Sequence, residues 1–419
     1  MLRLLIENIL DRKETIMNEQ ITTLASLTID GKGSYGIGAS AVPFSKDLYT
    51  YLRITDIKDD GTLNLQDLKS VDDVKASEYL LKPNDIVFAR TGASTGRNYF
   101  YDGTDGEFVY AGFLIKFSID EKKVNPKYIK YFCQSKQYKD WINSFNTGST
   151  RGNINAQTLG KMPIPLIERK TQDALVSIIS SIDEKIKKNN AINNNLLQQL
   201  DTLYDEFSHR KKWSTVIIND IAEKVAMGPF GSNIKVSTFV SEGVPIISGN
   251  HLRGYFLEEP SFNYITEEHA QRLKNSIVYP KDIVFTHAGN IGQVAMIPDD
   301  CRYPMYVLSQ RQFYLRCDTE KAIPEYVVLF FHSKQGQHEL LSYANQTGVP
   351  SIAQPATNLK KIPLKLPPID EQRQWLQVVS PIIKLYQSNV YENEHLSSMR
   401  DSLLPKLMSG ELDVSDIDI

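Results

Sequence analysis

The segment Pro83-Asn-Asp-Ile-Val-Phe-Ala-Arg-Thr-Gly92 is repeated 197 residues later as Pro280-Lys-Asp-Ile-Val-Phe-Thr-His-Ala-Gly289. Each copy has the pattern of a short buried strand that ends in a glycine-containing turn. The repeat continues along the chain, because residues 126–137 resemble 324–335 and residues 159–203 resemble 359–403. The matches keep their order while the offset drifts by only three residues. The chain is therefore an internal duplication, and each copy should form a similar unit.

Length and composition set the broad class of the protein. The chain has 419 residues, a formal net charge of −3 and 23% charged residues, which predict a globular protein of two or more domains. No apolar run reaches the roughly 18 residues that a membrane span needs, so no membrane partner is expected. The N-terminal segment is interrupted by Glu7 and Asn8 and is a poor signal peptide. The three cysteines, Cys133, Cys301 and Cys317, suit neither a disulfide framework nor a zinc site, which favours a cytoplasmic protein.

Two long helices are expected, one in each copy. Apolar residues alternate three and four apart along residues 175–207 and again along residues 375–407, and this 3.5-residue period is typical of a coiled coil. Thr171 and Asp370 are suitable N-caps for the two helices. Pro381 falls inside the second pattern and predicts either a bend or a helix that starts anew there.

Each of the two stripes carries a pair of asparagines at its centre, Asn189 and Asn193 in the first and Asn389 and Asn393 in the second. If the helices pair antiparallel and centre to centre, all four side chains fall in one layer, where buried Asn can fix the register. The alternative is a frayed break at residues 189–195, because Asn is a mediocre helix former. The repetition of the pair favours the role in register.

Several segments resemble the specificity subunit of type I restriction-modification enzymes. They are Met399-Arg-Asp-Ser-Leu-Leu-Pro-Lys-Leu-Met-Ser-Gly-Glu-Leu-Asp-Val414, Ile362-Pro-Leu-Lys-Leu-Pro-Pro-Ile-Asp-Glu-Gln372, Gly228-Pro-Phe-Gly-Ser232, Val244-Pro-Ile-Ile-Ser-Gly-Asn250 and Tyr51-Leu-Arg-Ile-Thr-Asp-Ile57. The resemblance extends from about Gln20 to the C-terminus. The first copy departs from it at Pro165–Gln172, which lacks the double proline.

The resemblance implies an α+β protein with two target recognition domains, residues 18–168 and 214–368, each reading one half of a bipartite site in double-stranded DNA. Two long spacer helices, residues 169–213 and 369–410, would form an antiparallel coiled coil with a pseudo-twofold relation between the copies. Residues 1–17 are an N-terminal extension, with Met17 as an alternative start, and residues 411–419 are a C-terminal tail.

Partners and cofactors also follow from the resemblance. Two adenine methyltransferase (M) subunits and the restriction (R) subunits would join this chain. S-adenosylmethionine, ATP and Mg are expected on those subunits, so this chain would bind no cofactor and no metal and would carry no catalysis.

The residues themselves give no enzyme signature. There is no Asn-Pro-Pro-Tyr motif and no Walker A sequence. Gly31-Lys-Gly-Ser-Tyr-Gly36 fits the dinucleotide pattern but is not followed by a helical pattern. Two alternatives stay open at this point: a duplicated coiled-coil scaffold that binds proteins without reading DNA, and an enzyme with an unrecognised site.

The turns after the repeated strands are the best candidates for reading DNA. Arg can contact guanine with two hydrogen bonds, Asn and Gln suit adenine, and Ser or Thr can contact bases or phosphates. The first turn offers Arg90, Thr91, Ser94, Thr95 and Arg97, and the second offers His287, Asn290 and Gln293. Further candidates are the segment Gly148-Ser-Thr-Arg-Gly-Asn153, which includes Arg151, its counterpart Gly348-Val-Pro-Ser351, and Arg53, Lys58, His251, Arg253, Gln310 and Arg311. The alternative for each is an ordinary hairpin residue or an ion-pair partner.

Overall fold

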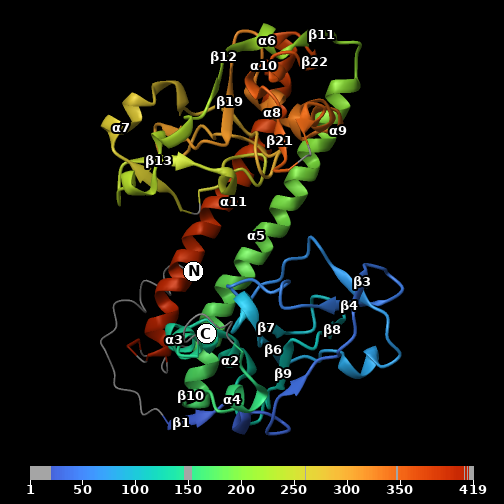
Figure 1. The fold of residues 1–419 in the computed structure, drawn as a ribbon, viewed down its shortest axis with the longest axis vertical. Coiled ribbons are helices and arrows are strands. Elements are labelled where there is room, and N and C mark those ends of the chain that lie inside the picture. The colour runs from blue at the N-terminus through green and yellow to red at the C-terminus, as the bar shows by residue number, and fades with distance from the viewer. Residues whose placement is uncertain are drawn as a thin grey trace. The chain divides into compact units, whose positions relative to one another are not determined.

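The computed structural model describes residues 20–145, 153–259, 261–345, 348–409, 411–412 and 414. The N-terminal extension therefore lies outside the described residues. The chain divides into two compact units, residues 1–187 with 395–419 (unit 1) and residues 188–394 (unit 2). The two long helices, α5 (Arg169–His209) and α11 (Ile369–Met408), each contribute one part to unit 1 and the other part to unit 2 (Figure 1).

Unit 1 contains two four-stranded sheets, in the orders β2-β9-β6-β7 and β3-β5-β4-β8, and a β1-β10 pair. Pairing is antiparallel except between β4 and β8. The strands are β1 (Gln20–Thr23), β2 (Ser34–Tyr35), β3 (Ala41–Pro43), β4 (Tyr49–Leu52), β5 (Lys69–Val71), β6 (Asp85–Ala89), β7 (Asn98–Tyr101), β8 (Phe108–Tyr110), β9 (Leu114–Ser118) and β10 (Pro163–Leu166). The short helices are α2 (Pro126–Phe132), α3 (Lys136–Asn143) and α4 (Ala156–Gly160).

Unit 2 repeats this arrangement, with the sheets β12-β19-β16-β17 and β14-β13-β18-β15 and the pairs β11-β22 and β20-β21. The strands are β11 (Ser214–Ile217), β12 (Ala222–Met227), β13 (Val244–Ile247), β14 (Asn263–Ile265), β15 (Ile277–Val278), β16 (Ile283–Thr286), β17 (Val294–Met296), β18 (Tyr306–Leu308), β19 (Gln312–Cys317), β20 (Ala344–Asn345), β21 (Ser351–Ile352) and β22 (Pro363–Leu366). The helices are α6 (Ile218–Ile221), α7 (Glu267–Arg272), α8 (Pro324–His332), α9 (Lys334–Leu341) and α10 (Pro355–Leu359).

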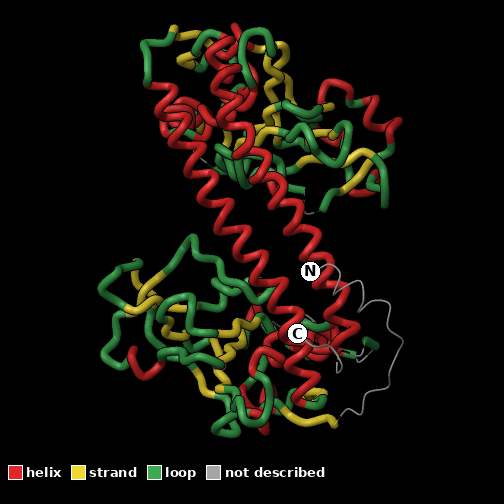
Figure 2. The backbone as a smooth tube through the Cα atoms, turned by 180° about the vertical axis from the view of Figure 1, so that it is seen from behind, coloured by secondary structure: helices red, strands yellow, loops and turns green. Residues whose placement is uncertain are grey.

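The register of the central strands shows that the repeat is also a structural repeat. Phe88 lies opposite Ile115 in unit 1, and Phe285 lies opposite Phe313 in unit 2. The residue before the repeated Asp has a left-handed backbone in both copies, with φ of 71° at Asn84 and at Lys281. The α+β class, the two duplicated domains and the two long helices are thus confirmed, and Figure 2 shows the short strands of each unit joined by long loops.

The long helices run antiparallel within each unit. In unit 1 the guanidinium of Arg400 donates to Asp183 at 3.1 Å, and Ile182 and Leu403 share one core with Phe117. In unit 2 the partner number falls as the residue number rises. Asn189 contacts Asn393, Asn193 contacts Asn389, and Phe207 stacks on Trp375 with the ring centroids 5.6 Å apart. The predicted antiparallel pairing therefore holds in each unit.

The two expected helix caps are wrong, and so is one of the two alternatives at Pro381. α5 begins at Arg169 and α11 at Ile369, so Thr171 and Asp370 lie inside the first turns and cap neither helix. α11 does not start anew at Pro381, whose exposed ring lies on the outer face of a continuous helix.

Residues 126–142 and 324–341 each begin with Pro and carry apolar residues at helical spacing, which predicts one helix in each copy, but the structure divides each segment into two helices. α2 is followed by α3 and α8 by α9, because Ser135 and Ser333 accept backbone N–H groups at 3.2 and 3.1 Å and start a new helix.

Candidate nucleic-acid interface

The turn after β6 is held between two other segments of unit 1. The backbone N–H of Arg90 donates to the carbonyl of Phe113 at 3.1 Å, and the N–H of Ile154 donates to the carbonyl of Arg90 at 2.9 Å. Thr91 forms a β-bridge with Asn153. Arg90, Phe113 and Asn153, which are far apart in the sequence, are thereby brought together beside the end of a buried strand.

The turn after β16 is held in the same way in unit 2. The N–H of His287 donates to Arg311 at 2.9 Å, and the N–H of Ile352 donates to His287 at 2.8 Å. Ala288 forms a β-bridge with Ser351. By these contacts His287 occupies the place of Arg90, Arg311 that of Phe113, and Ser351 that of Asn153.

A glycine fixes a further segment against the same place in each unit. A Cβ on Gly36 would lie 2.2 Å from the carbonyl oxygen of Ala111, and a Cβ on Gly228 would lie 2.0 Å from that of Ser309, so no larger residue fits at either position. The residue before each glycine, Tyr35 or Met227, is paired with the strand that follows the close contact. Four equivalent positions therefore gather in each unit, and we call them the reading cluster: Tyr35, Arg90, Phe113 and Asn153 in unit 1; Met227, His287, Arg311 and Ser351 in unit 2.

The Arg90 side chain is restrained but carries no counter-ion. Its guanidinium lies over the ring of Tyr35, 5.1 Å from the centroid, and the Tyr35 hydroxyl accepts the N–H of Ala156 at 3.1 Å. The Nε of Arg90 is buried without a hydrogen-bond partner, and no carboxylate among the described residues pairs with this guanidinium. Phe113, whose carbonyl accepts the backbone N–H of Arg90, is 59% exposed.

In unit 2 the cation comes from a different position of the reading cluster. Arg311 is exposed and pairs with no carboxylate among the residues that the structure describes. Its terminal nitrogen would lie 3.3 Å from a Cβ on Gly289, so the guanidinium lies against the turn after β16. His287 contacts the carbonyl of Gln310 through Nε2 at 3.2 Å, and burial lowers the pKa of its imidazole, which favours a neutral ring.

Two other candidate arginines are paired with carboxylates. Arg97 donates to Asp59 at 2.7 Å, and Arg53 makes a two-pronged contact with the buried Asp56, whose hydrogen bonds raise the pKa of Arg53. His251 is buried, stacked on Phe262 and bonded through Nε2 to the carbonyl of Ser261 at 2.8 Å. These side chains are occupied by contacts within their own unit.

The structure places the remaining candidates individually. Thr95 donates to the carbonyl of Gly92, Ser94 is buried, and Gln293 bridges Thr286 and Gly249. Gln310 donates to the carbonyl of Gly231. Lys58, Arg253 and Asn290 are exposed, and Arg151 lies outside the described residues.

Tyr35, Phe113 and Met227 are not among the candidates that the sequence offers for DNA contact, whereas Asn153 and Ser351 end the two candidate segments 148–153 and 348–351. Tyr35 belongs to the segment that fits the dinucleotide pattern, but this segment forms strand β2 and opens no helix. Only the strand pairing brings these residues to the turns after β6 and β16.

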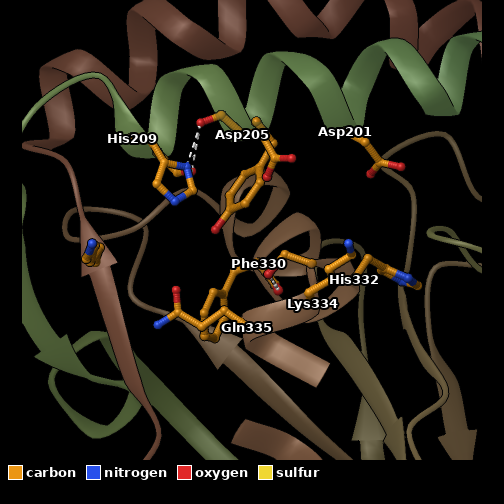
Figure 3. A pocket seen from close by; sticks show the side chains of 11 residues that line it. Asp201, Asp205, His209, Phe330, His332, Lys334 and Gln335 are labelled. Atoms are coloured by element: carbon orange, nitrogen blue, oxygen red, sulfur yellow. Dashed lines mark hydrogen bonds between the residues drawn. The ribbon is translucent and has the colours of Figure 1, made fainter. Parts of the chain in front are cut away.

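A cavity of about 540 Å³ in unit 2 lies between the last turns of α5 and helices α8 and α9 (Figure 3). Ser208 Oγ lies 3.0 Å from Nδ1 of His209, but the same nitrogen meets the carbonyl of Asp205 at 2.9 Å. A Ser–His–Asp relay needs the hydroxyl and the carboxylate on different ring nitrogens. These contacts are those of a helix end.

Elsewhere in the described chain no three His, Cys, Asp or Glu residues gather as a metal site requires, and no described helix could cross a membrane.

Comparison with known proteins agrees with the duplicated fold. A family model described as the type I restriction modification DNA specificity domain matches residues 46–198 and again residues 210–396. Since the two matches cover most of the chain, this protein belongs to that family, as the sequence resemblance predicted.

Two relatives and one solved structure illustrate the likeness. The MjaIX specificity subunit of Methanocaldococcus jannaschii is 20% identical over 328 residues, which cover 71% of this chain and 72% of that protein. The EcoKI specificity subunit of Escherichia coli K12 is 22% identical over 416 residues, covering 89% and 84%. A type I S subunit from M. genitalium superimposes with a TM-score of 0.53 at 16% identity over 93% of this chain and 96% of that one, which shows a shared fold.

Proposed function

We propose that this chain reads a bipartite DNA site, with one half read by each domain, and directs adenine methylation and restriction by partner subunits. The observation that supports it most is the reading cluster. Two domains present the same backbone frame at equivalent places but carry different side chains there. A pair of domains that read unlike half-sites needs this combination, because a common frame docks in a common way while base-contacting side chains set the sequence.

The charge of the molecule agrees with local reading of DNA. A protein with a net charge of −3 cannot bind DNA through its overall charge, so it needs Lys or Arg side chains at the places where it contacts the phosphates and bases. Arg90 and Arg311 are guanidinium groups that no described carboxylate neutralises, and one lies in the reading cluster of each unit.

The catalytic groups and cofactors belong to other chains in this proposal. Two M subunits with S-adenosylmethionine, and R subunits with ATP and Mg, assemble with this chain in the cytoplasm. The purified chain by itself should transfer no methyl group and bind no S-adenosylmethionine.

The test uses the chain purified together with its M subunits. Methylated adenines are mapped on genomic DNA incubated with the complex, and the site deduced from the map is then used in a binding assay. DNA carrying this site should bind at least about 10³-fold more tightly than DNA with both half-sites scrambled. A complex that assembles but shows no sequence preference would instead support the scaffold alternative. Methyl transfer by the chain alone would contradict its non-catalytic role.

A further inference from the structure

Arg90 and Arg311 differ from other arginines of this chain because their guanidinium groups form no ion pair with a described carboxylate. Arg53, Arg97 and Arg316 each donate to a carboxylate, with nitrogen–oxygen distances of 2.6–2.7 Å in their shortest contacts. No described carboxylate pairs with Arg90 or Arg311, although both lie in a reading cluster. Their positions are not equivalent, since Arg90 matches His287 and Arg311 matches Phe113. Each reading cluster thus contains one guanidinium without a described carboxylate partner, but the arginine occupies a different one of the four equivalent positions in each unit.

The surroundings of Arg90 leave only one edge of its guanidinium for a ligand. The Nε–H is buried, and the ring of Tyr35 lies against the guanidinium. The Tyr35 hydroxyl is itself bonded to Ala156 at the start of α4, which holds the ring in place. The terminal amino groups remain, and these are the donors that form a two-pronged contact with O6 and N7 of guanine. A planar fork held on an aromatic ring suits such a contact better than a single phosphate oxygen, which a mobile lysine serves equally well.

The neighbours in each reading cluster add further readable chemistry. The exposed Phe113, whose backbone pairs with that of Arg90, can contact a thymine methyl group with its ring. In unit 2, the imidazole of His287 adds a polar ring close to the charge of Arg311.

We infer that Arg90 and Arg311 each read one guanine, Arg90 in the half-site of the first domain and Arg311 in the half-site of the second. This inference rests on the proposed function. It goes further by assigning a base and by separating these two arginines from Arg53 and Arg97, which pair with carboxylates in the fold.

The experiment maps methylated adenines for complexes that contain Arg90→Ala, Arg90→Lys, Arg311→Ala or Arg311→Lys. Each alanine variant should relax the target at one G·C pair in one half-site only and reduce discrimination against other bases there by about 5- to 150-fold. The lysine variants keep the charge but lose the fork, so they should relax the same base pair. Lys136→Ala and Arg272→Ala remove exposed cations of each unit that pair with an acid one helical turn away, and serve as matched controls with an unchanged target.

Other results of the same experiment would overturn the inference. If alanine weakens binding to all sequences alike, lowers the slope of log K against log salt by about one and is rescued by lysine, the arginine contacts a phosphate and the inference is wrong. Relaxation of both half-sites by one variant would also overturn it. Thermal melting and co-purification with the M subunits verify that each variant folds, and the lysine variants serve if an alanine variant does not. An unaltered complex that methylates no fixed sequence would remove the proposed function itself, and the inference with it.

Discussion

His332, at the C-terminal end of α8, has a half-buried ring that can donate a hydrogen bond while it is neutral. Its Nε2 lies 2.8 Å from the carbonyl oxygen of Val294, so this nitrogen carries the proton, and the ring stacks on Tyr255 with centroids 3.9 Å apart. Burial lowers the pKa of His332 from 6.5 to about 4. The folded protein therefore holds this imidazole neutral at pH values where an unfolded chain would protonate it.

This difference makes stability depend on pH. The contribution is fully present above the unfolded pKa and is lost as pH falls toward the folded pKa, because the unfolded state then binds the extra proton. The loss should reach at most roughly 3 kcal/mol of unfolding free energy near pH 4. His332→Gln should remove this part of the pH dependence, as measured by urea unfolding at about pH 7 and about pH 4.5. His338→Gln, at an exposed position of α9, is the control. If the unfolding free energy changes equally between the two pH values in His332→Gln and in the unaltered chain, His332 is not the source of this pH dependence.

At this scale the sequence predicts side-chain chemistry better than it predicts side-chain partners. Arg90 and Arg97 leave the same turn and look alike in the sequence. They differ because Asp59, 38 residues away from Arg97, is folded against it, whereas Tyr35 is folded against Arg90. Neither pairing follows from local periodicity. Tyr35, Phe113 and Met227 were not predicted as DNA-contacting residues for the same reason.

Among the elements, the long helices contain a layer of asparagines at the centre of a mainly apolar stripe. Asn189 donates to Asn393 at 2.9 Å and Asn389 donates to Asn193 at 2.8 Å, and Asn193 and Asn389 are less than 9% exposed. Residues 189–195 lie within continuous helix, so the alternative of a frayed break is wrong. Pairing the helices out of register would bury these amides without partners, which costs about 1–3 kcal/mol for each. The role of the four asparagines in fixing register remains a prediction.

A double-mutant cycle tests this role. Asn193→Leu leaves the amide of Asn389 unpaired and should lower the unfolding free energy by about 1–3 kcal/mol. Adding Asn389→Leu makes both positions apolar and should restore much of the loss, because neither partner is then left unsatisfied. Asn194→Leu, at an exposed position on the same helix, controls for the loss of an amide in general. Additive losses from the two leucines, measured by denaturant unfolding, would show that the pair does not interact.

Element types followed well from the sequence, whereas element ends did not. The heptad stripe gave the two helices, since burial of an apolar face dominates over the mediocre propensity of Asn and the cost of an exposed proline. The helix breaks at Ser135 and Ser333 were not predicted, because the sequence pattern does not distinguish a serine that caps a new helix from a serine on the polar face of a continuing one.

For the whole molecule, the duplication means that two recognition domains are joined by helices of about 60 Å, as 41 residues at 1.5 Å each imply. We expect the length of α5 to set how many base pairs separate the half-sites. Deleting residues 186–192 removes one heptad, keeps the stripe in phase and shortens the helix by about 10 Å. It also removes Asn189. Activity on the original site should be lost, and any remaining methylation should occur at unchanged half-sites with a shorter spacer.

Deleting only two residues is the matched comparison, because it turns the stripe by about 200° and should prevent assembly. Methylation of the original site, with its spacer unaltered, by the heptad-deletion chain would show that the helices do not measure distance.

The claim that each domain reads one half-site is tested most directly by exchanging one domain. Residues 18–168 are replaced by the first recognition domain of a relative with a different target, and methylated adenines are mapped with the same M subunits. One half of the recognised sequence should change to that of the relative while the other half stays the same. A map in which both halves change, or in which the original site persists intact, would contradict it.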